Sequence, residues 1–378
     1  MTATIISIMP MTVCGVLSAL LALSLYDQWD RAKFRLLLFT TAATLLYMGH
    51  FAYFNHLTAA IPLTDTLYSL TNPAVFPLYF FYIEELTQLR PNRRLQILCL
   101  LPALCCFLAV GTLYLMMDPQ QTALFIQRHL YGDELLSLTG LPRWQAYAHI
   151  MVRIVFALQL PPVLIVGFRH IRQYNQMVDN NYSNTEGKRL VRIKTLLVLF
   201  TLTTILSFTL NIIGRNLFAT SVWILAIPST AYSLLILLIC HVGLNQHFYI
   251  RDIDHDAISQ PEPVQMPKVN QELMEKIRKT VTEQKLFLQP NLKISDVAHL
   301  LHTNRNYIYN AINVETGISF SDFINQQRID YADRLMKQNP DLTISDIVTQ
   351  SGFTSTSAFY RNYKKYKGST PTENRTRN

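Results

Sequence analysis

The stretch that decides the fold of the C-terminal third occurs twice, as ISDVAHLLHTNRNYIYNAINVETG at residues 294–317 and ISDIVTQSGFTSTSAFYRNYKKYKG at residues 344–368. Each copy begins with Ile-Ser-Asp, continues through a short apolar segment and a turn, and closes with a second amphipathic segment. We expect Ser295 and Ser345 to cap the first helix of each copy, and the following Asp to favour the positive end of that helix. Each copy is therefore predicted to form a helix-turn-helix unit.

The second helix of each copy has an apolar face that can pack inward. Apolar residues recur on it at the three- and four-residue spacing of a helix face. The positions predicted to pack are Tyr307, Ile308, Ala311 and Ile312 in the first copy, and Phe359 and Tyr363 in the second. This packing leaves the opposite face of each helix to solvent or to a partner.

Residues on the opposite face carry the hydrogen-bonding groups that read DNA bases. Arg can bind guanine through two hydrogen bonds, Asn can do the same for adenine, and Ser or Thr can serve either base. The predicted base contacts are Arg305, Asn306, Tyr309 and Asn310 in the first copy, and Thr356, Ser357, Tyr360 and Arg361 in the second. At the end of the second copy, Lys364, Lys365 and Lys367 are predicted to bind phosphates, which position a protein without specifying sequence.

The repetition favours this DNA-reading interpretation over a merely solvated surface. A charged, solvated face would explain any one of these side chains taken alone. An ordinary helical pair, however, has no need of the same turn and polar second helix 50 residues later. The net charge of +8 also suits an anionic partner, either nucleic acid or lipid headgroups.

The last 110 residues are similar to the DNA-binding domain of the AraC/XylS family of bacterial transcription regulators. The matching stretches are LKISDVAHLL, TGISFSDFINQQRIDYADRLM, ISDIVTQSGF and FYRNYKKYKGSTPTENR. The resemblance implies two helix-turn-helix units joined by a linker helix at about residues 321–337, with both second helices in successive major-groove segments on one face of the DNA. Two positions depart from the family pattern: His302 stands where a turn usually has glycine, and Asn374 where an aromatic residue is usual.

The first 243 residues are far more apolar than this C-terminal third. A hydrophobic run of about 20 residues can cross the hydrocarbon core of a bilayer as a helix. The third of the runs in this sequence is the weakest, because Asp65, Asn72 and two prolines interrupt it. In all, seven runs are predicted to span a membrane, at residues 5–25, 35–54, 62–83, 95–117, 146–168, 195–214 and 219–242.

The distribution of Lys and Arg between the runs predicts their orientation, because cytoplasmic loops are enriched in these residues. The loops after the first, third and fifth runs hold 12 of them, whereas the opposite side holds Arg128, Arg143 and Arg215. We therefore expect the N-terminus outside and the segment after the seventh run in the cytoplasm, where bacterial DNA lies. The predicted location is the bacterial inner (cytoplasmic) membrane, as a multi-pass protein.

The chain is thus predicted to be all-α, with a seven-helix transmembrane bundle at residues 1–243 and a cytoplasmic AraC-type double helix-turn-helix domain at residues 269–378. Between them, residues 244–268 lose the apolar pattern and contain three prolines that end any continuing helix, which predicts a linker. This arrangement resembles membrane-embedded AraC-type regulators found mainly in Bacteroidetes-like bacteria. Over the first 240 residues the resemblance is architectural and implies no functional residue.

Ionisable side chains inside a membrane span are costly and invite a functional interpretation. Arg153 lies inside the fifth run, and His50 and Tyr53 lie near the outer end of the second. We expect these three residues to mark an outward-facing pocket in which Arg153 holds an anionic signal ligand. The alternative is structural: Arg153 pairs with a neighbouring carboxylate or carbonyl, or extends outward to the membrane interface.

The sequence favours a membrane-bound one-component transcription factor whose partners are double-stranded DNA, the lipid bilayer and an unknown signal ligand. Dimerisation would suit such a regulator, although no heptad seam demands a homodimer. Enzymatic activity, a metal site and a cofactor are not expected, because catalytic motifs are lacking and the five cysteines have no metal-site spacing. The alternatives are a seven-helix enzyme or transporter with a fused autoregulatory DNA-binding domain, and a scaffold whose helix-turn-helix units bind protein.

Overall fold

The computed structural model describes residues 2–88, 91–132, 134–213, 222–246, 248–253 and 271–377. Regular structure in these residues is helical, and the β-type pairing among them is limited to an isolated bridge between Tyr182 and Lys293. By its internal contacts the chain forms two compact units, Met1–Ile171 with Val191–His247 and Arg172–Leu190 with Phe248–Asn378. The predicted all-α class is confirmed.

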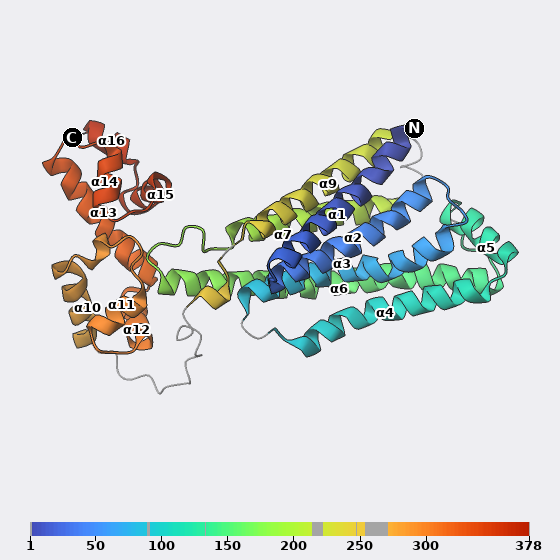
Figure 1. The fold of residues 1–378 in the computed structure, drawn as a ribbon, viewed down its shortest axis with the longest axis horizontal. Helices are drawn as coiled ribbons and strands as arrows, with labels where there is room; N and C mark the ends of the chain where they lie inside the picture. Colours follow the sequence, from blue (N-terminus) through green and yellow to red (C-terminus); the bar gives the residue numbers. More distant parts are fainter. Residues whose placement is uncertain are drawn as a thin grey trace. The chain divides into compact units, whose positions relative to one another are not determined.

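Long helices lying side by side make up the first unit (Figure 1). The last ten residues of the longest of them, α6, belong by their contacts to the second unit. Each apolar run predicted from the sequence coincides with one long helix, as far as the structure describes it. The elements are α1 (Thr2–Asp27), α2 (Arg31–Phe54), α3 (Ile61–Thr87), α4 (Arg93–Met116), α5 (Pro119–Phe125), the π-helical turn η1 (Ile126–Leu130), α6 (Gly140–Asn181), α7 (Val191–Ile213) and α9 (Val222–Leu244).

Five of these helices are long and apolar enough to cross a membrane, judged by length and composition over the described residues. They are α1, α2, α4, α6 and α9; the predicted third and sixth runs, which form α3 and α7, do not reach that measure. Helix α3 is interrupted by polar residues, yet most of its side chains are buried in the bundle and so are shielded from lipid. The prediction of seven membrane-spanning helices is thus supported for five of them.

The buried carboxylate of Glu84 shows how α3 accommodates polar groups. Glu84 accepts hydrogen bonds from Gln96 Nε2 at 2.7 Å and from the backbone N–H of Asn92 at 3.1 Å. Gln96 accepts in turn from Arg35 Nη2 at 3.0 Å. A buried charge is costly unless it is hydrogen-bonded in this way. These contacts join α2, α3 and the start of α4.

The second unit contains the repeated helices of the sequence. One buried apolar cluster joins α10, α11, α12 and the start of α13, and another joins the rest of α13 to α14 and α15. Helix α13 is thus shared by both halves, as predicted for the linker helix at residues 321–337. The elements are η2 (Ile250–Asp252), α10 (Gln271–Glu283), η4 (Leu286–Leu288), α11 (Ile294–Leu300), α12 (Arg305–Thr316), α13 (Phe320–Gln338), α14 (Ile344–Gln350), α15 (Thr356–Lys367) and α16 (Pro371–Arg377).

The prediction that Ser295 and Ser345 cap the first helix of each copy is wrong. Helices α11 and α14 begin two residues earlier, directly after Lys293 and Thr343. In both helices the aspartate at the third position accepts the backbone N–H of the residue before the helix, at 2.8 and 3.1 Å. The aspartate thus satisfies a terminal N–H group that would otherwise need another partner, and the two serines lie inside the first turn.

The turns of the two helix-turn-helix units differ in what they require. His302, which stands in the first turn where glycine is usual, has a φ of 49° and so adopts the left-handed backbone that glycine adopts most readily. Gly352 in the second turn has a φ of 79°, and a Cβ there would lie 2.7 Å from the carbonyl oxygen of Leu288. The second turn therefore needs glycine for both conformation and space, whereas the first accommodates a side chain with some strain.

The predicted linker at residues 244–268 falls largely outside the described residues. Residues 248–253, which are described, belong to the second unit, and Ile250 and Ile253 are buried there. The chain therefore joins the second unit soon after the end of α9, before the prolines of the predicted linker.

Candidate nucleic-acid interface and membrane pocket

The packed face of α12 follows the predicted spacing with one exception. Ile308, Ala311 and Ile312 are buried. Tyr307, predicted to pack with them, is 44% exposed, whereas Tyr309, predicted to face outward, packs against the domain core. At about 100° per residue, both tyrosines flank the apolar face almost equally, so the spacing alone does not separate them. Tyr307 is therefore more exposed than predicted, and Tyr309 is half-buried at the edge of the outward face.

The outward face of α12 carries amides and one cation. Asn310 is exposed, and Arg305 and Asn306 are half-buried at the start of the helix. The side-chain oxygen of Asn304 caps the helix by accepting the N–H of Asn306 at 2.9 Å. These side chains suit base edges, but they supply little positive charge for phosphates.

The packed face of α15 agrees with the sequence. Phe359 and Tyr363 are fully buried, as predicted. The Tyr363 hydroxyl donates to Asp333 Oδ1 at 2.9 Å and accepts from Asn374 Nδ2 at 2.7 Å. Asn374, at the position where the family usually has an aromatic residue, therefore holds α16 to α15 through a hydrogen bond.

The outward face of α15 is more open than that of α12. Thr356, Ser357 and Arg361 are exposed, as expected for residues that meet a partner. Tyr360 is half-buried, and its hydroxyl lies 3.0 Å from Thr372 Oγ1. Three of the four predicted base contacts on α15 are thus directly accessible.

The three lysines at the end of α15 differ in their surroundings. Lys365 Nζ lies 2.5 Å from Asp322 and Lys367 Nζ lies 2.8 Å from Asp330, both on the linker helix α13. Lys364 is exposed. Because exposed ion pairs contribute only about 0.2–1 kcal/mol, a phosphate can replace either carboxylate at low cost.

Arg328 of α13 connects the segment before the first helix-turn-helix unit to the turn of the second, a role that the repeated motifs do not predict. It is 1% exposed; its Nε donates to the carbonyl of Phe287 at 2.6 Å, and its Nη2 donates to that of Gln289 at 2.6 Å. The guanidinium lies 5.6 Å from the centroid of the Phe353 ring in the second turn. Burial lowers the pKa of Arg328 to about 10, so it stays charged at neutral pH. Its four-residue spacing from the buried Ile324 is the signal that could have identified it.

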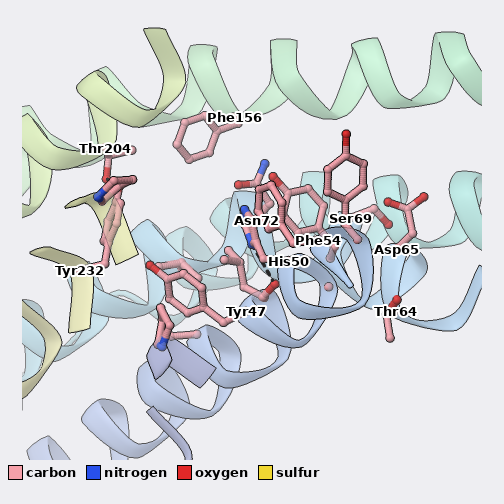
Figure 2. Close-up of a pocket in the computed structure, with 18 of the residues that line it drawn as sticks. Tyr47, His50, Phe54, Thr64, Asp65, Ser69, Asn72, Phe156, Thr204 and Tyr232 are labelled. Carbon is pink, nitrogen blue, oxygen red and sulfur yellow. Dashed lines mark hydrogen bonds between the residues drawn. The ribbon is translucent and has the colours of Figure 1, made fainter. Parts of the chain in front are cut away.

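A cavity of about 240 Å³ lies inside the first unit (Figure 2). Its lining comes from α1, α2, α3, α6, α7 and α9 and includes His50, Tyr53 and Arg153, the three residues predicted to mark a signal site. Figure 2 shows His50 of α2 and Asp65 of α3 beside this space, with aromatic side chains around them. The structure thus brings the three residues to one cavity, although they come from distant parts of the sequence.

The lining also carries the polar pair Asp65 and His149. Asp65 accepts a hydrogen bond from the Tyr114 hydroxyl at 2.8 Å and lies 2.6 Å from His149 Nε2. The other ring nitrogen of His149, Nδ1, lies 2.8 Å from the carbonyl oxygen of Gln145. Arg153 is the one Lys or Arg residue of the described lining.

Comparison with known proteins identifies the C-terminal region. Residues 297–377 match the family model described as a helix-turn-helix domain. The chain is similar to the Msm operon regulatory protein of Streptococcus mutans, at 32% identity over 83 residues, which are 22% of this chain and 30% of that protein. It is also similar to the uncharacterized transcriptional regulatory protein YesN of Bacillus subtilis, at 33% identity over 86 residues, which are 22% of this chain and 23% of that protein. No solved structure matches the chain.

These similarities define the class of the domain. Residues 297–377 are a helix-turn-helix domain of the AraC type, a class that binds DNA. The matched region spans less than a third of the length of each of these two relatives. The similarity therefore describes the C-terminal domain and not the whole chain.

Proposed function

We propose that the chain is a membrane-bound one-component transcription factor of the bacterial inner membrane, and not an enzyme. The observation that carries the proposal is the presence of an AraC-type helix-turn-helix domain on the same chain as five helices suited to a bilayer. The 12 basic residues in the loops after the first, third and fifth apolar runs support a cytoplasmic position for that domain.

In this proposal α12 and α15 enter successive segments of the major groove. The exposed face of α15 and the amide-rich face of α12 support base reading, while Tyr309 and Tyr360 contribute from the edges of the two faces. Lys364 binds a phosphate directly, and Lys365 and Lys367 exchange their carboxylate partners for phosphates. The proposed base contacts are Arg305, Asn306, Tyr309, Asn310, Thr356, Ser357, Tyr360 and Arg361.

The cavity in the first unit is proposed to bind the signal. Its aromatic wall suits the apolar body of a small ligand, and the guanidinium of Arg153 in its lining favours an anionic head. His50 and Tyr53 add hydrogen-bonding groups to the same lining. Such a ligand changes DNA occupancy only if it binds two states of the protein unequally.

DNA binding is tested with the full chain in lipid nanodiscs and duplexes selected from a random library. We expect specific binding whose affinity falls as salt rises, because protein–phosphate contacts release counterions. Failure to select any duplex would contradict the proposed function. A reporter fused after residue 245 tests the orientation: it should be active in the cytoplasm, and activity outside would contradict the proposed topology.

The ligand class is tested separately with octanoate and decanoate as probes and the alcohols of the same chain length as matched controls. We expect the carboxylates to raise the melting temperature of the full chain more than the alcohols do. Arg153→Gln should remove that difference, whereas Arg143→Gln, outside the cavity lining, should keep it. Equal stabilisation by acid and alcohol in the unmodified chain would contradict an anionic ligand.

A further inference from the structure

Residues 182–190, the docking loop, connect α6 to α7 but pack within the second unit. In the sequence they stand between two helices that line the membrane cavity. Ser183, near the start of the loop, precedes its contact Ser321 on α13 by 138 residues. A loop predicted to lie on the cytoplasmic side is therefore bound to the DNA-binding domain.

Ser183 is the centre of this contact. It is 1% exposed, and its N–H donates to the carbonyl of Leu292 at 3.0 Å. Its carbonyl accepts from Ser321 Oγ at 3.2 Å and from Asn325 Nδ2 at 3.3 Å, and its Oγ accepts from Arg328 Nη2 at 3.1 Å. Its backbone N–H, its carbonyl and its Oγ are thus each hydrogen-bonded to the DNA-binding domain, and these bonds offset the cost of burying the residue.

Tyr182 and Lys188 secure the two sides of the loop. The Lys188 ammonium lies 5.4 Å from the centroid of the Tyr182 ring and 5.7 Å from that of Phe248. The Tyr182 hydroxyl donates to the carbonyl of Asp252 at 3.2 Å. Burial lowers the pKa of Lys188, and the nearby charge of Lys293 adds to that effect. The loop is therefore held both by the DNA-binding domain and by the residues that follow α9.

Glu186 in the docking loop is hydrogen-bonded to the residue that caps α15. Its two carboxylate oxygens accept from Ser355 Oγ at 2.8 and 2.7 Å, and Ser355 is the residue that caps this helix. The N-terminus of a helix carries partial positive charge and is a common position for a bound phosphate. Thr356 and Ser357, two of the proposed base contacts, follow directly. The carboxylate thus stands where a DNA phosphate would approach the recognition helix.

Two further DNA-contact residues face the docking loop. A polar cavity of about 310 Å³ lies between the loop and helices α13 and α15. Arg361 and Lys365 line it on one side, and Thr185 and Arg189 line it on the other. The loop therefore lies beside Arg361 and Lys365 of α15, where a DNA backbone bound to these side chains would meet it.

We propose that the docking loop is an autoinhibitory ligand of the DNA-binding domain, and that DNA binding displaces it. The proposal rests on the proposed function, because it assigns α15 to DNA. Glu186 mimics a phosphate at the helix N-terminus, and Ser183 anchors the loop on α13. Because the ends of the loop continue into α6 and α7, a ligand that rearranges these two cavity-lining helices would change how readily the loop leaves.

The affinity test compares three full-length proteins in nanodiscs on one selected duplex. Glu186→Gln removes the phosphate-like charge and should raise the affinity about fivefold or more, which is the usual lower range of a coupling between two sites. Glu283→Gln changes the net charge equally at an exposed position on α10, and its affinity should stay near that of the unmodified chain. Equal affinities for all three proteins would contradict autoinhibition.

Hydrogen exchange supplies an independent readout. The backbone N–H of Ser183 is buried and bonded to Leu292, so it should exchange slowly in the unmodified chain and faster once the duplex is bound. Unchanged protection of Ser183 in the DNA complex would overturn displacement while leaving DNA binding intact. Absence of any DNA binding, with the loop still protected, would overturn the proposed function and, with it, this inference.

Discussion

The two helix-turn-helix units begin from the same repeated sequence but differ in what surrounds their second helices. Helix α12 is capped by Asn304 and offers Arg305 among amides. Helix α15 carries Arg361 and three lysines, and the carboxylate of Glu186 is bonded to its cap. The comparison teaches that most of the positive charge and the contact with the docking loop lie on the same helix, α15, so the two recognition helices are proposed to contribute unequally to DNA binding.

The largest expected effect comes from the residue that joins the two units. Arg328→Met leaves the carbonyls of Phe287 and Gln289 without their buried donor, and each such loss costs about 1–3 kcal/mol. We expect the free energy of unfolding of the DNA-binding domain to fall by about 3 kcal/mol or more, measured by pulse proteolysis of the full chain in urea. Arg334→Met, at an exposed position of the same helix, is the control and should stay within about 0.5 kcal/mol. Equal effects of the two substitutions would mean that Arg328 does not hold the units together.

The turns provide the next comparison. Gly352→Ala forces a Cβ against the carbonyl of Leu288 in a left-handed backbone, and we expect it to destabilise the domain by about 2 kcal/mol. His302→Gly relieves strain but adds freedom to the unfolded chain, so its effect should remain within about 1 kcal/mol. Both effects are measured by hydrogen exchange of the backbone N–H groups of α11 and α14 at increasing temperature. A Gly352→Ala protein as stable as the unmodified chain would contradict the asymmetry between the turns.

Several features of the two helix-turn-helix units could be predicted from local patterns in the sequence. The apolar spacing identifies Phe359 and Tyr363, and the glycine-like position of His302 predicts its positive φ. The starts of α11 and α14 could not be assigned from Ser295 and Ser345 alone. In each helix the aspartate after the serine accepts the backbone N–H of the residue before the helix, so the helix begins earlier than the serine would suggest. Tyr307 and Tyr309 flank the apolar face almost equally, and tertiary packing decides between them.

Substitutions of Arg361 in α15 and Arg305 in α12 should alter the preference for different bases of the DNA site. Arg361→Ala is expected to cost about 1–3 kcal/mol at one base position of the selected duplex, because an exposed Arg can form two hydrogen bonds to guanine. Arg305→Ala, on the half-buried start of α12, should act at a different position in the other half of the site. Affinities on duplexes with single base changes measure both effects. A loss that is equal on every sequence would make Arg361 a phosphate contact.

The smallest expected effect concerns the lysines at the end of α15. Lys365→Ala should weaken binding to all duplexes alike and reduce the slope of log affinity against log salt by about 1, as expected for one phosphate contact. Its ion pair with Asp322 is exposed and weak, so it should not prevent this contact. An unchanged salt slope would show that Lys365 pairs with Asp322 of α13 and does not contact a DNA phosphate.

Long-range contacts lay beyond the reach of the sequence. His50, Tyr53 and Arg153 were selected because polar groups are costly in a membrane span, and the structure brings them to one cavity. The docking loop had no comparable signal, because Ser183 and Glu186 are ordinary residues of a polar loop. Their roles depend on partners more than 130 residues away, and no periodicity or motif encodes such a pairing.

The most direct test of the proposed membrane-bound, DNA-reading function is enrichment of genomic fragments on the full-length protein embedded in nanodiscs. The account predicts that a small set of fragments is retained, that they share two half-sites about one helical turn apart, and that Arg361→Ala alters the base preference in one half-site. Retention of no fragments, or of fragments without a shared sequence, would contradict the account.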